Sequence, residues 1–229
     1  MNSTTPIARE GFPFIALSTG LTLLLAISAW QFCSTVLWLM VAFTLSLSLF
    51  ITFFFRDPER VAPEDVRAVL SPADGKVVVS ECVPTSPLGS AALKISIFMS
   101  VFDVHVNRTP LSGRVTGIAY DQGRFFDVRD GRASCENERS CILLDAECGV
   151  RIAFVQIAGL IARRIVPFVK GGDIVAAGQR VGLIRFGSRV DVYLPEGTEP
   201  RVLMGQKVIA GETVLAEIGQ APAIEGVRQ

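Results

Sequence analysis

The 229-residue chain has little histidine, since His105 is its only one. A zinc, iron or copper site built from several histidines of one subunit is therefore excluded, and any acid or base work by an imidazole falls to this residue. An excess of charge of either sign is also lacking, because 22 Lys and Arg residues balance 22 Asp and Glu residues. This balance argues against a general nucleic-acid-binding protein, which needs a surplus of basic side chains.

Closely spaced cysteine pairs are lacking as well, since no two of the five cysteines are separated by only two residues. Cys135, Cys141, Cys148 and His105 could form a zinc site by number alone, but their wide and irregular spacing does not fit the usual metal-binding patterns. We expect no metal and we expect reduced thiols, as in the cytosol.

Charged residues are lacking between Gly11 and Phe55, a stretch that holds both tryptophans and more than half of the phenylalanines. As a helix it would span roughly twice the ~30 Å hydrocarbon core of a bilayer. We therefore predict two transmembrane helices, at about 12–29 and 34–55, joined by a turn at about 30–32. The second apolar segment follows the first at once, which does not fit a cleaved signal peptide. A buried helical hairpin in a soluble protein is the alternative, and the length of the charge-free run disfavours it.

The flanking charges suggest an orientation for this hairpin. Arg9 precedes the first predicted span, and Arg56 and Arg60 follow the second. Because basic residues concentrate on the cytoplasmic side, we expect both ends of the hairpin in the cytoplasm. The sequence thus divides into a membrane anchor, residues 1–55, and a globular domain, residues 56–229, that is long enough for one sizeable core.

The globular domain is predicted to be mainly β, because short runs rich in Val, Ile and Phe alternate with Gly, Pro and Asp. Residues 160–167 alone suggest a brief helical or irregular passage. A weak repeat relates 172–181 to 205–214, each copy with the pattern of a strand, a glycine turn and a strand. We expect two similar hairpins packed in a compact β barrel or sandwich, a pattern that resembles biotinyl and lipoyl carrier domains. The predicted strands are 77–83, 93–99, 115–120, 141–146, 151–157 and 189–194.

Three short segments carry the candidate chemistry. Asp74 lies in an acidic turn before a strand, where an aspartate commonly accepts local backbone hydrogen bonds. His105 follows a hydrophobic strand, and a rigid strand can hold an imidazole in a fixed pose, although a lone histidine is more often structural. Ser188 follows Gly187 between two strand-like runs. A hydrolase nucleophile elbow needs glycine two residues before and two after the serine, and this segment does not fit it.

In this order, the Pro-x-Asp-Gly turn, the Phe-x-x-x-x-Asp-Val-His stretch, the Gln-Ile-Ala-Gly segment at 156–159 and the Phe-Gly-Ser segment at 186–188 resemble the phosphatidylserine decarboxylase family. The resemblance is to its short, membrane-anchored bacterial and archaeal branch, and it runs from about residue 56 to the end. No single motif suffices, but their joint order behind a hydrophobic hairpin argues against an accidental similarity.

The resemblance implies a proenzyme. Ser188 would attack the carbonyl of Gly187, and the chain would split into a β chain that ends at residue 187 and an α chain of residues 188–229. The first residue of the α chain would become a pyruvoyl group, which replaces an external cofactor and forms a Schiff base with the amine of phosphatidylserine. The products would be phosphatidylethanolamine and carbon dioxide.

The resemblance also assigns roles to side chains. Asp74 and His105 occupy the positions of the family's carboxylate and imidazole, with Asp74 orienting the ring. Long-branch relatives carry a second histidine where this chain has Arg108, so His105 either serves both self-cleavage and decarboxylation or shares the work with another group. We expect Arg108 and Arg189 to supply positive charge for the phosphate and carboxylate of the substrate headgroup.

The implied partners are the membrane, its phospholipid and the paired β and α chains, with no nucleic acid. The catalytic domain would lie at the cytoplasmic side of the cell membrane, and Phe125 and Phe126 could help it to dock. Three alternatives remain open: an archaetidylserine-type decarboxylase, a membrane-tethered lipoyl-like carrier that uses Lys207, and a serine hydrolase that uses Asp74, His105 and Ser188.

Overall fold

The computed structural model describes residues 6–124, 126–128, 136–159, 164–185 and 187–219. Contacts divide the chain into two units, residues 1–59 and 60–229. The N-terminal unit holds a short 3-10 helix, η1 (Arg9–Gly11), followed by α1 (Phe12–Phe32) and α2 (Thr35–Phe54), which pack against each other. Both long helices are apolar and long enough to cross a membrane, as predicted. The first is longer than predicted, and the turn lies at Cys33, which adopts the left-handed conformation with φ 47°.

The helical hairpin turns apolar side chains outward and keeps its polar groups paired within itself. Leu17 and Trp30 are 75% and 80% exposed. The hydroxyl of Thr22 donates to the carbonyl of Ser18 at 2.8 Å, and the Ser18 hydroxyl donates to that of Ser48 at 3.1 Å, from one helix to the other. This arrangement suits a bilayer, where no water is available to satisfy polar groups.

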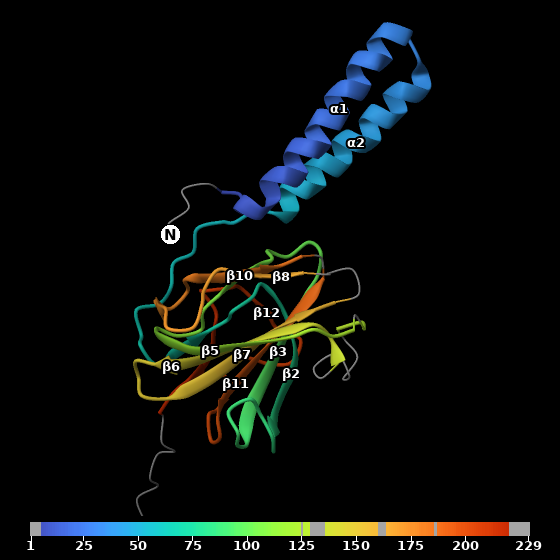
Figure 1. Ribbon diagram of the computed structural model, residues 1–229. Coiled ribbons are helices and arrows are strands. Elements are labelled where there is room, and N and C mark those ends of the chain that lie inside the picture. Colours follow the sequence, from blue (N-terminus) through green and yellow to red (C-terminus); the bar gives the residue numbers. More distant parts are fainter. Residues whose placement is uncertain (1–5, 125, 129–135, 160–163, 186, 220–229) are drawn as a thin grey trace, which may run out of the picture. The chain divides into compact units, whose positions relative to one another are not determined.

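The C-terminal unit is built of strands, which confirms the mainly β prediction (Figure 1). All six predicted strands are present, each one or two residues longer at one or both ends, and residues 165–167 form a strand where an irregular passage was expected. The strands are β1 (Ala68–Leu70), β2 (Gly75–Val83), β3 (Ala92–Met99), β4 (Val106–Arg108), β5 (Gly113–Asp121), β6 (Arg139–Ala146), β7 (Arg151–Ala158), β8 (Ile165–Pro167), β9 (Ile174–Val175), β10 (Arg180–Ile184), β11 (Ser188–Pro195), β12 (Lys207–Val208) and β13 (Val214–Glu217).

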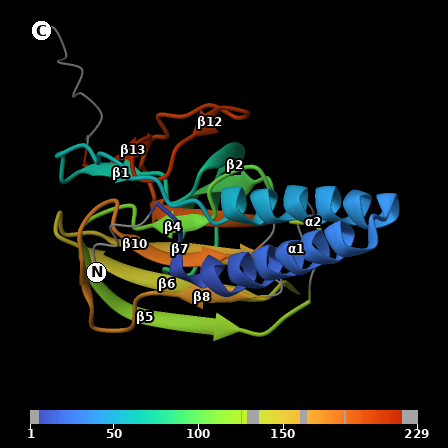
Figure 2. The same ribbon diagram turned by 90° about the horizontal axis from the view of Figure 1, so that it is seen from above.

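The strands form one large sheet and two small ones. The eight-stranded sheet has the order β12-β2-β3-β11-β7-β6-β5-β9, the three-stranded sheet β4-β10-β8 and the two-stranded sheet β1-β13. All pairings between these strands are antiparallel. Figure 2 shows β1 beside β13, and β7, β6 and β5 of the large sheet side by side in that order. The strand β11 therefore lies in the middle of the large sheet, between β3 and β7.

The central strands are covered on both faces. Along β11, Val190 and Val192 join the main apolar cluster, whereas Tyr193 joins a smaller cluster on the opposite face. Every described residue of β7 after Arg151 is buried. Strands buried on both faces read as nearly continuous hydrophobic runs, which is why these two were visible in the sequence.

The predicted internal repeat is present as local structure but not as hairpins. Each copy has a glycine turn, with Gly178 at φ 73° and Gly211 at φ 75°. The two turns lie against each other, because a Cβ built on Gly211 would be 3.5 Å from the Cα of Gly178. The strands within a copy do not pair with each other: β9 pairs with β5, β10 with β4 and β8, β12 with β2, and β13 with β1. The expected hairpin pairing is therefore wrong, because each of these strands finds its hydrogen-bonding edge on a strand outside its own copy of the repeat.

Candidate active site

Ser188 is the first residue of β11 and lies between two neighbouring strands. It is opposite Met99 at the end of β3 and opposite Ala158 at the end of β7. The serine has no exposed surface. The Gly187–Ser188 bond is thus held at the point where three strands of the large sheet end together.

Gly187 brings the backbone into this strand from an unusual direction. Its φ is 66°, in the left-handed region that favours glycine. Its N–H donates to Nε2 of His105, with 3.3 Å between the nitrogens. The only histidine of the chain is thereby placed beside the predicted cleavage site.

His105 is fully buried and held by two backbone groups. Its Nδ1 lies 2.9 Å from the carbonyl oxygen of Asp103. Because a carbonyl can only accept, Nδ1 carries the proton and Nε2 is left to accept from Gly187. The Asp103 carboxylate in turn accepts from the N–H and hydroxyl of Ser100, at 2.8 and 2.7 Å. The turn after β3 therefore fixes the tautomer and orientation of the ring.

A chain of buried polar groups continues from the Ser188 hydroxyl. The hydroxyl donates to the thioether of Met99 at 3.2 Å, and the side-chain amide of Asn107 lies 3.6 Å from the same sulfur. The Gln156 amide donates to the carbonyl oxygen of the Asn107 side chain at 2.8 Å. A thioether is a weak acceptor, so the hydroxyl is held loosely and can be released at little cost.

Asp74 makes its described contacts with other parts of the unit. One carboxylate oxygen accepts from the guanidinium of Arg60 at 2.8 Å, and the other accepts from the backbone N–H of Ala210 at 2.8 Å. Its side chain is 14% exposed. These bonds tie the predicted acidic turn to distant residues, and the role of Asp74 beside His105 remains a prediction.

Arg108 and Arg189 are both buried rather than displayed on the surface. The Arg108 guanidinium donates to the carbonyl of Gly178 at 2.9 Å. Arg189 forms a two-pronged ion pair with Asp191, at 2.8 and 3.0 Å, and donates to the Val128 carbonyl at 2.8 Å. Because side chains alternate along a strand, Arg189 points to the face of β11 opposite Ser188. This arrangement favours Arg108 over Arg189 for a headgroup, and both assignments remain predictions.

Three residues of the site were missed by sequence reasoning. Met99 was predicted only as the end of a strand, Asp103 only as part of the Phe-x-x-x-x-Asp-Val-His stretch, and Arg60 only as a charge that follows the membrane segment. Met99 lies beside Ser188 because of the register of β3 against β11, and Asp103 contacts His105 through its backbone carbonyl. Neither contact depends on a side-chain pattern that could be seen in the sequence.

Several other expectations concern residues at the edge of the described chain. Phe125 and Cys135 lie outside the described residues, whereas Phe126 is half-buried and donates its N–H to the side chain of Asn137 at 2.9 Å. Among the residues that the structure describes, no three His, Cys, Asp or Glu side chains come together in a way that could hold a metal.

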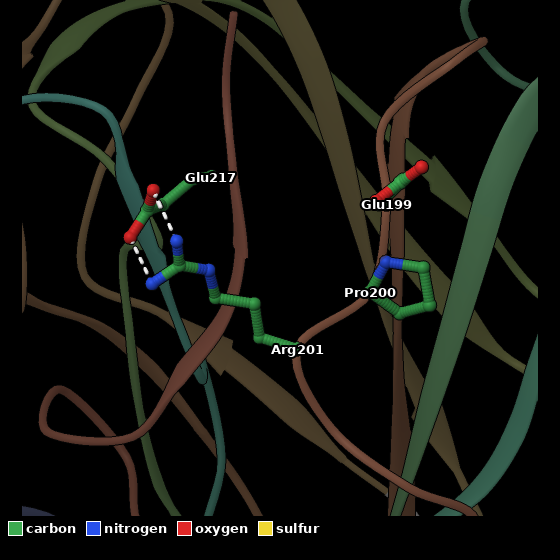
Figure 3. A pocket seen from close by; sticks show the side chains of 4 residues that line it. All are labelled: Glu199, Pro200, Arg201 and Glu217. Carbon is green, nitrogen blue, oxygen red and sulfur yellow. Dashed lines mark hydrogen bonds and ion pairs between the residues drawn. The ribbon is translucent and has the colours of Figure 1, made fainter. Parts of the chain in front are cut away.

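One surface pocket contains none of the predicted site residues. It is lined by Glu199, Pro200, Arg201 and Glu217 (Figure 3). Arg201 and Glu217 form an ion pair across it, with 2.6 Å between Nη2 and Oε2. Because this guanidinium already has its carboxylate and is half-exposed, the pocket offers no chemistry comparable with that around Ser188.

Comparison with known proteins agrees with this geometry. The family model described as phosphatidylserine decarboxylase matches residues 47–216. A protein of Pelobacter propionicus named phosphatidylserine decarboxylase proenzyme is 59% identical, over 95% of this chain and 99% of its own length. Proteins of the same name from Novosphingobium aromaticivorans and Geobacter sulfurreducens are 54% and 52% identical, over 97% and 93% of this chain and 91% and 97% of their own lengths. The chain therefore belongs to the phosphatidylserine decarboxylase family.

Proposed function

We propose that this chain converts phosphatidylserine to phosphatidylethanolamine and carbon dioxide, with a pyruvoyl group that it makes by cutting itself between Gly187 and Ser188. The observation that carries the proposal is the arrangement at this bond: a buried serine follows a glycine at positive φ whose N–H meets Nε2 of the only histidine. The name proenzyme, given to the relatives, supports processing into two chains.

Self-cleavage begins with the Ser188 hydroxyl. Rotation about its Cα–Cβ bond moves Oγ from the Met99 sulfur toward the carbonyl carbon of Gly187. Oγ bonds to that carbon, and the hydroxyl proton passes to Nε2 of His105, which gives up its hydrogen bond from the Gly187 N–H to take it. The C–N bond then breaks, the proton moves to the serine nitrogen, and an ester remains.

The second stage separates the chains. Loss of the Cα proton of Ser188 breaks its Cβ–Oγ bond, so that Gly187 leaves as a carboxylate and residue 188 becomes dehydroalanine. Its enamine takes up a proton and is hydrolysed by water, which releases ammonia and leaves the ketone. The surroundings fit this group, because the Met99 sulfur that faces the hydroxyl can equally contact the methyl group that replaces it.

The bound pyruvoyl group supplies a carbonyl for the substrate amine and an electron sink for decarboxylation. His105 would then give a proton to the substrate carbon that loses carbon dioxide, since the ring is the titratable group already beside residue 188. Arg108 is the favoured partner of the phosphate, and Asp74 stays in place as the carboxylate that supports the site.

The helical hairpin would keep this chemistry at the membrane, with the β unit on the cytoplasmic side and the phospholipid supplied from the bilayer. The paired chains after cleavage would be residues 1–187 and 188–229. The two strands that contact Ser188, β3 and β7, belong to the first chain, and β11 belongs to the second, so the hydrogen-bonded ladder holds them together.

A trapping experiment tests this function. Purified full-length protein in detergent is incubated with carboxyl-labelled phosphatidylserine, with and without sodium cyanoborohydride. We expect release of labelled carbon dioxide, and with the reductant a lipid adduct on the fragment of residues 188–229. Absence of carbon dioxide release, or an adduct confined to the fragment of residues 1–187, would contradict the proposal.

A further inference from the structure

Gly159 follows β7 directly opposite the predicted cleavage site. The register pairs Ser188 with Ala158. In an antiparallel pair, the residue after Ala158 lies opposite the residue before Ser188, so Gly159 lies opposite Gly187. A Cβ built on Gly159 would lie 2.4 Å from the carbonyl oxygen of Gly187 and 3.2 Å from its carbonyl carbon. The φ of Gly159 is outside the left-handed region, so its conformation does not itself require glycine. Glycine is required because the Gly187 carbonyl approaches so closely that a Cβ would clash with it.

The strand register directs the backbone N–H of Gly159 to the side of the same carbonyl. The N–H of Ala158 donates to the carbonyl of Glu138, on the side of β6, at 2.9 Å. Successive N–H groups of an extended strand point to opposite sides, so that of Gly159 is directed to the side of β11. This is the side on which the Gly187 oxygen lies.

We propose that Gly159 is a positioning residue for self-cleavage. Its bare Cα leaves room for the Gly187 carbonyl, and its N–H is directed to the side of the oxygen that becomes negatively charged when Ser188 attacks. A backbone donor placed at a developing oxyanion stabilises the transition state in the same way as in acyl transfer. This inference rests on the proposed cleavage at Gly187, and it adds the group that receives the negative charge.

The substitution Gly159→Ala tests the proposal. The added methyl group must displace the scissile carbonyl, so we expect self-cleavage to slow by about 10²-fold, the usual effect of losing an oxyanion donor. The rate is read from the fraction of intact chain during synthesis in a cell-free system. The matched control is Gly117→Ala in β5, where the nearest atom to an added Cβ is 3.8 Å away, and it should be cut at the wild-type rate.

Hydroxylamine shows which step is affected, because it cleaves an ester but not a peptide bond. We expect the Gly159→Ala chain to stay intact in hydroxylamine, since the block precedes the ester. Accumulation of a chain that hydroxylamine cuts at residue 187 would overturn the proposal.

A second pair of variants separates catalysis from folding. In the uncut Ser188→Ala background, Gly159→Ala should lower the melting temperature in detergent no more than Gly113→Ala does, because a Cβ built on Gly113 also meets a backbone carbonyl oxygen, at 2.3 Å. A clearly larger fall for Gly159→Ala would assign this glycine to folding and overturn the inference. If the wild type is cut at Gly187 and Gly159→Ala is cut equally fast, this inference alone fails; if the wild type is not cut, the proposed function fails with it.

Discussion

At the scale of single residues, two Gly-Ser pairs have different surroundings. Gly89 and Gly187 both have positive φ, 81° and 66°, so backbone conformation does not distinguish them. Ser90 is exposed, whereas Ser188 is buried and the N–H of its preceding glycine meets His105. The surroundings, rather than the dipeptide, distinguish the proposed cleavage site.

We therefore predict that Ser188→Ala leaves one uncut and inactive chain, because no hydroxyl remains to attack the carbonyl of Gly187. Electrophoresis of the purified protein and a decarboxylation assay check both outcomes. The matched control, Ser90→Ala, should be cut and active like the wild type. Two fragments from the Ser188→Ala chain would show that another residue is the nucleophile.

His105→Ala should remove both reactions. General acid or base catalysis typically contributes about 10²–10⁴-fold, so we expect a loss of that order in self-cleavage and in carbon dioxide release. Time courses of cleavage and activity measure the two effects separately. A variant that is cut normally but inactive would restrict the ring to decarboxylation and move the processing step to another group.

Cys141 provides a prediction that depends on pH. Burial raises the pKa of its thiol to about 11, whereas Cys82 is exposed. Cys141 therefore stays protonated below that pH, and because the thiolate is the reactive form, its alkylation rate should rise about tenfold per pH unit until pH 11. Iodoacetamide labelling followed by peptide mass spectrometry should find Cys82 modified well before Cys141 at pH 8. Equal rates would contradict this assignment.

At the scale of structural elements, β11 carries different chemistry on its two faces. One face begins with Ser188 and continues into the main core, and the other holds the ion pair of Arg189 and Asp191. Lys94 of β3 reaches the same carboxylate at 3.4 Å. The ion pair of Arg189 and Asp191 fixes side chains directly after Ser188, so we expect it to stabilise the fold.

Asp191→Asn should strongly destabilise the fold, because it leaves the buried Arg189 without its counter-charge. Breaking a buried pair costs about 3 kcal/mol, which corresponds to a fall of roughly 6–12 °C in Tm. The measurement uses the uncut Ser188→Ala background, so that a single chain melts. The control is Asp145→Asn, whose partner Arg151 is 57% exposed, and it should leave Tm unchanged. Equal effects of the two substitutions would contradict the structural role of the buried pair.

The sequence was sufficient to predict most elements but not their partners. Runs such as 151–157 and 189–194 were visible because buried central strands are nearly continuous in hydrophobic residues. The pairing of β9 with β5 and of β12 with β2 depends on strands far along the chain, so the repeat wrongly suggested local hairpins.

The candidate site was predictable only in part. Ser188 and His105 were recognised from their motifs, whereas Met99 and Gly159 depend on the register of three strands. Asp103 contributes a backbone carbonyl, which no residue type marks. Local motifs therefore indicated the candidate reactive groups, whereas the residues that contact them follow from strand pairing far along the chain.

At the scale of the whole molecule, the chain joins an apolar helical hairpin to a β unit that carries the candidate active site. If both ends of the hairpin face the cytoplasm, protease added to inside-out vesicles should degrade the β unit, and protease added to right-side-out vesicles should spare it. Immunoblots with an antibody to residues 60–187 measure this. Digestion only in right-side-out vesicles would reverse the orientation.

The most direct test of the account is the intact mass of the purified wild-type protein. We predict two species, residues 1–187 and residues 188–229, the smaller one lighter than a serine-terminated fragment by the mass of one ammonia. That difference reports conversion of Ser188 to the pyruvoyl group together with cleavage. A single full-length chain that still decarboxylates phosphatidylserine, or a small fragment that retains an ordinary serine, would contradict the central claim.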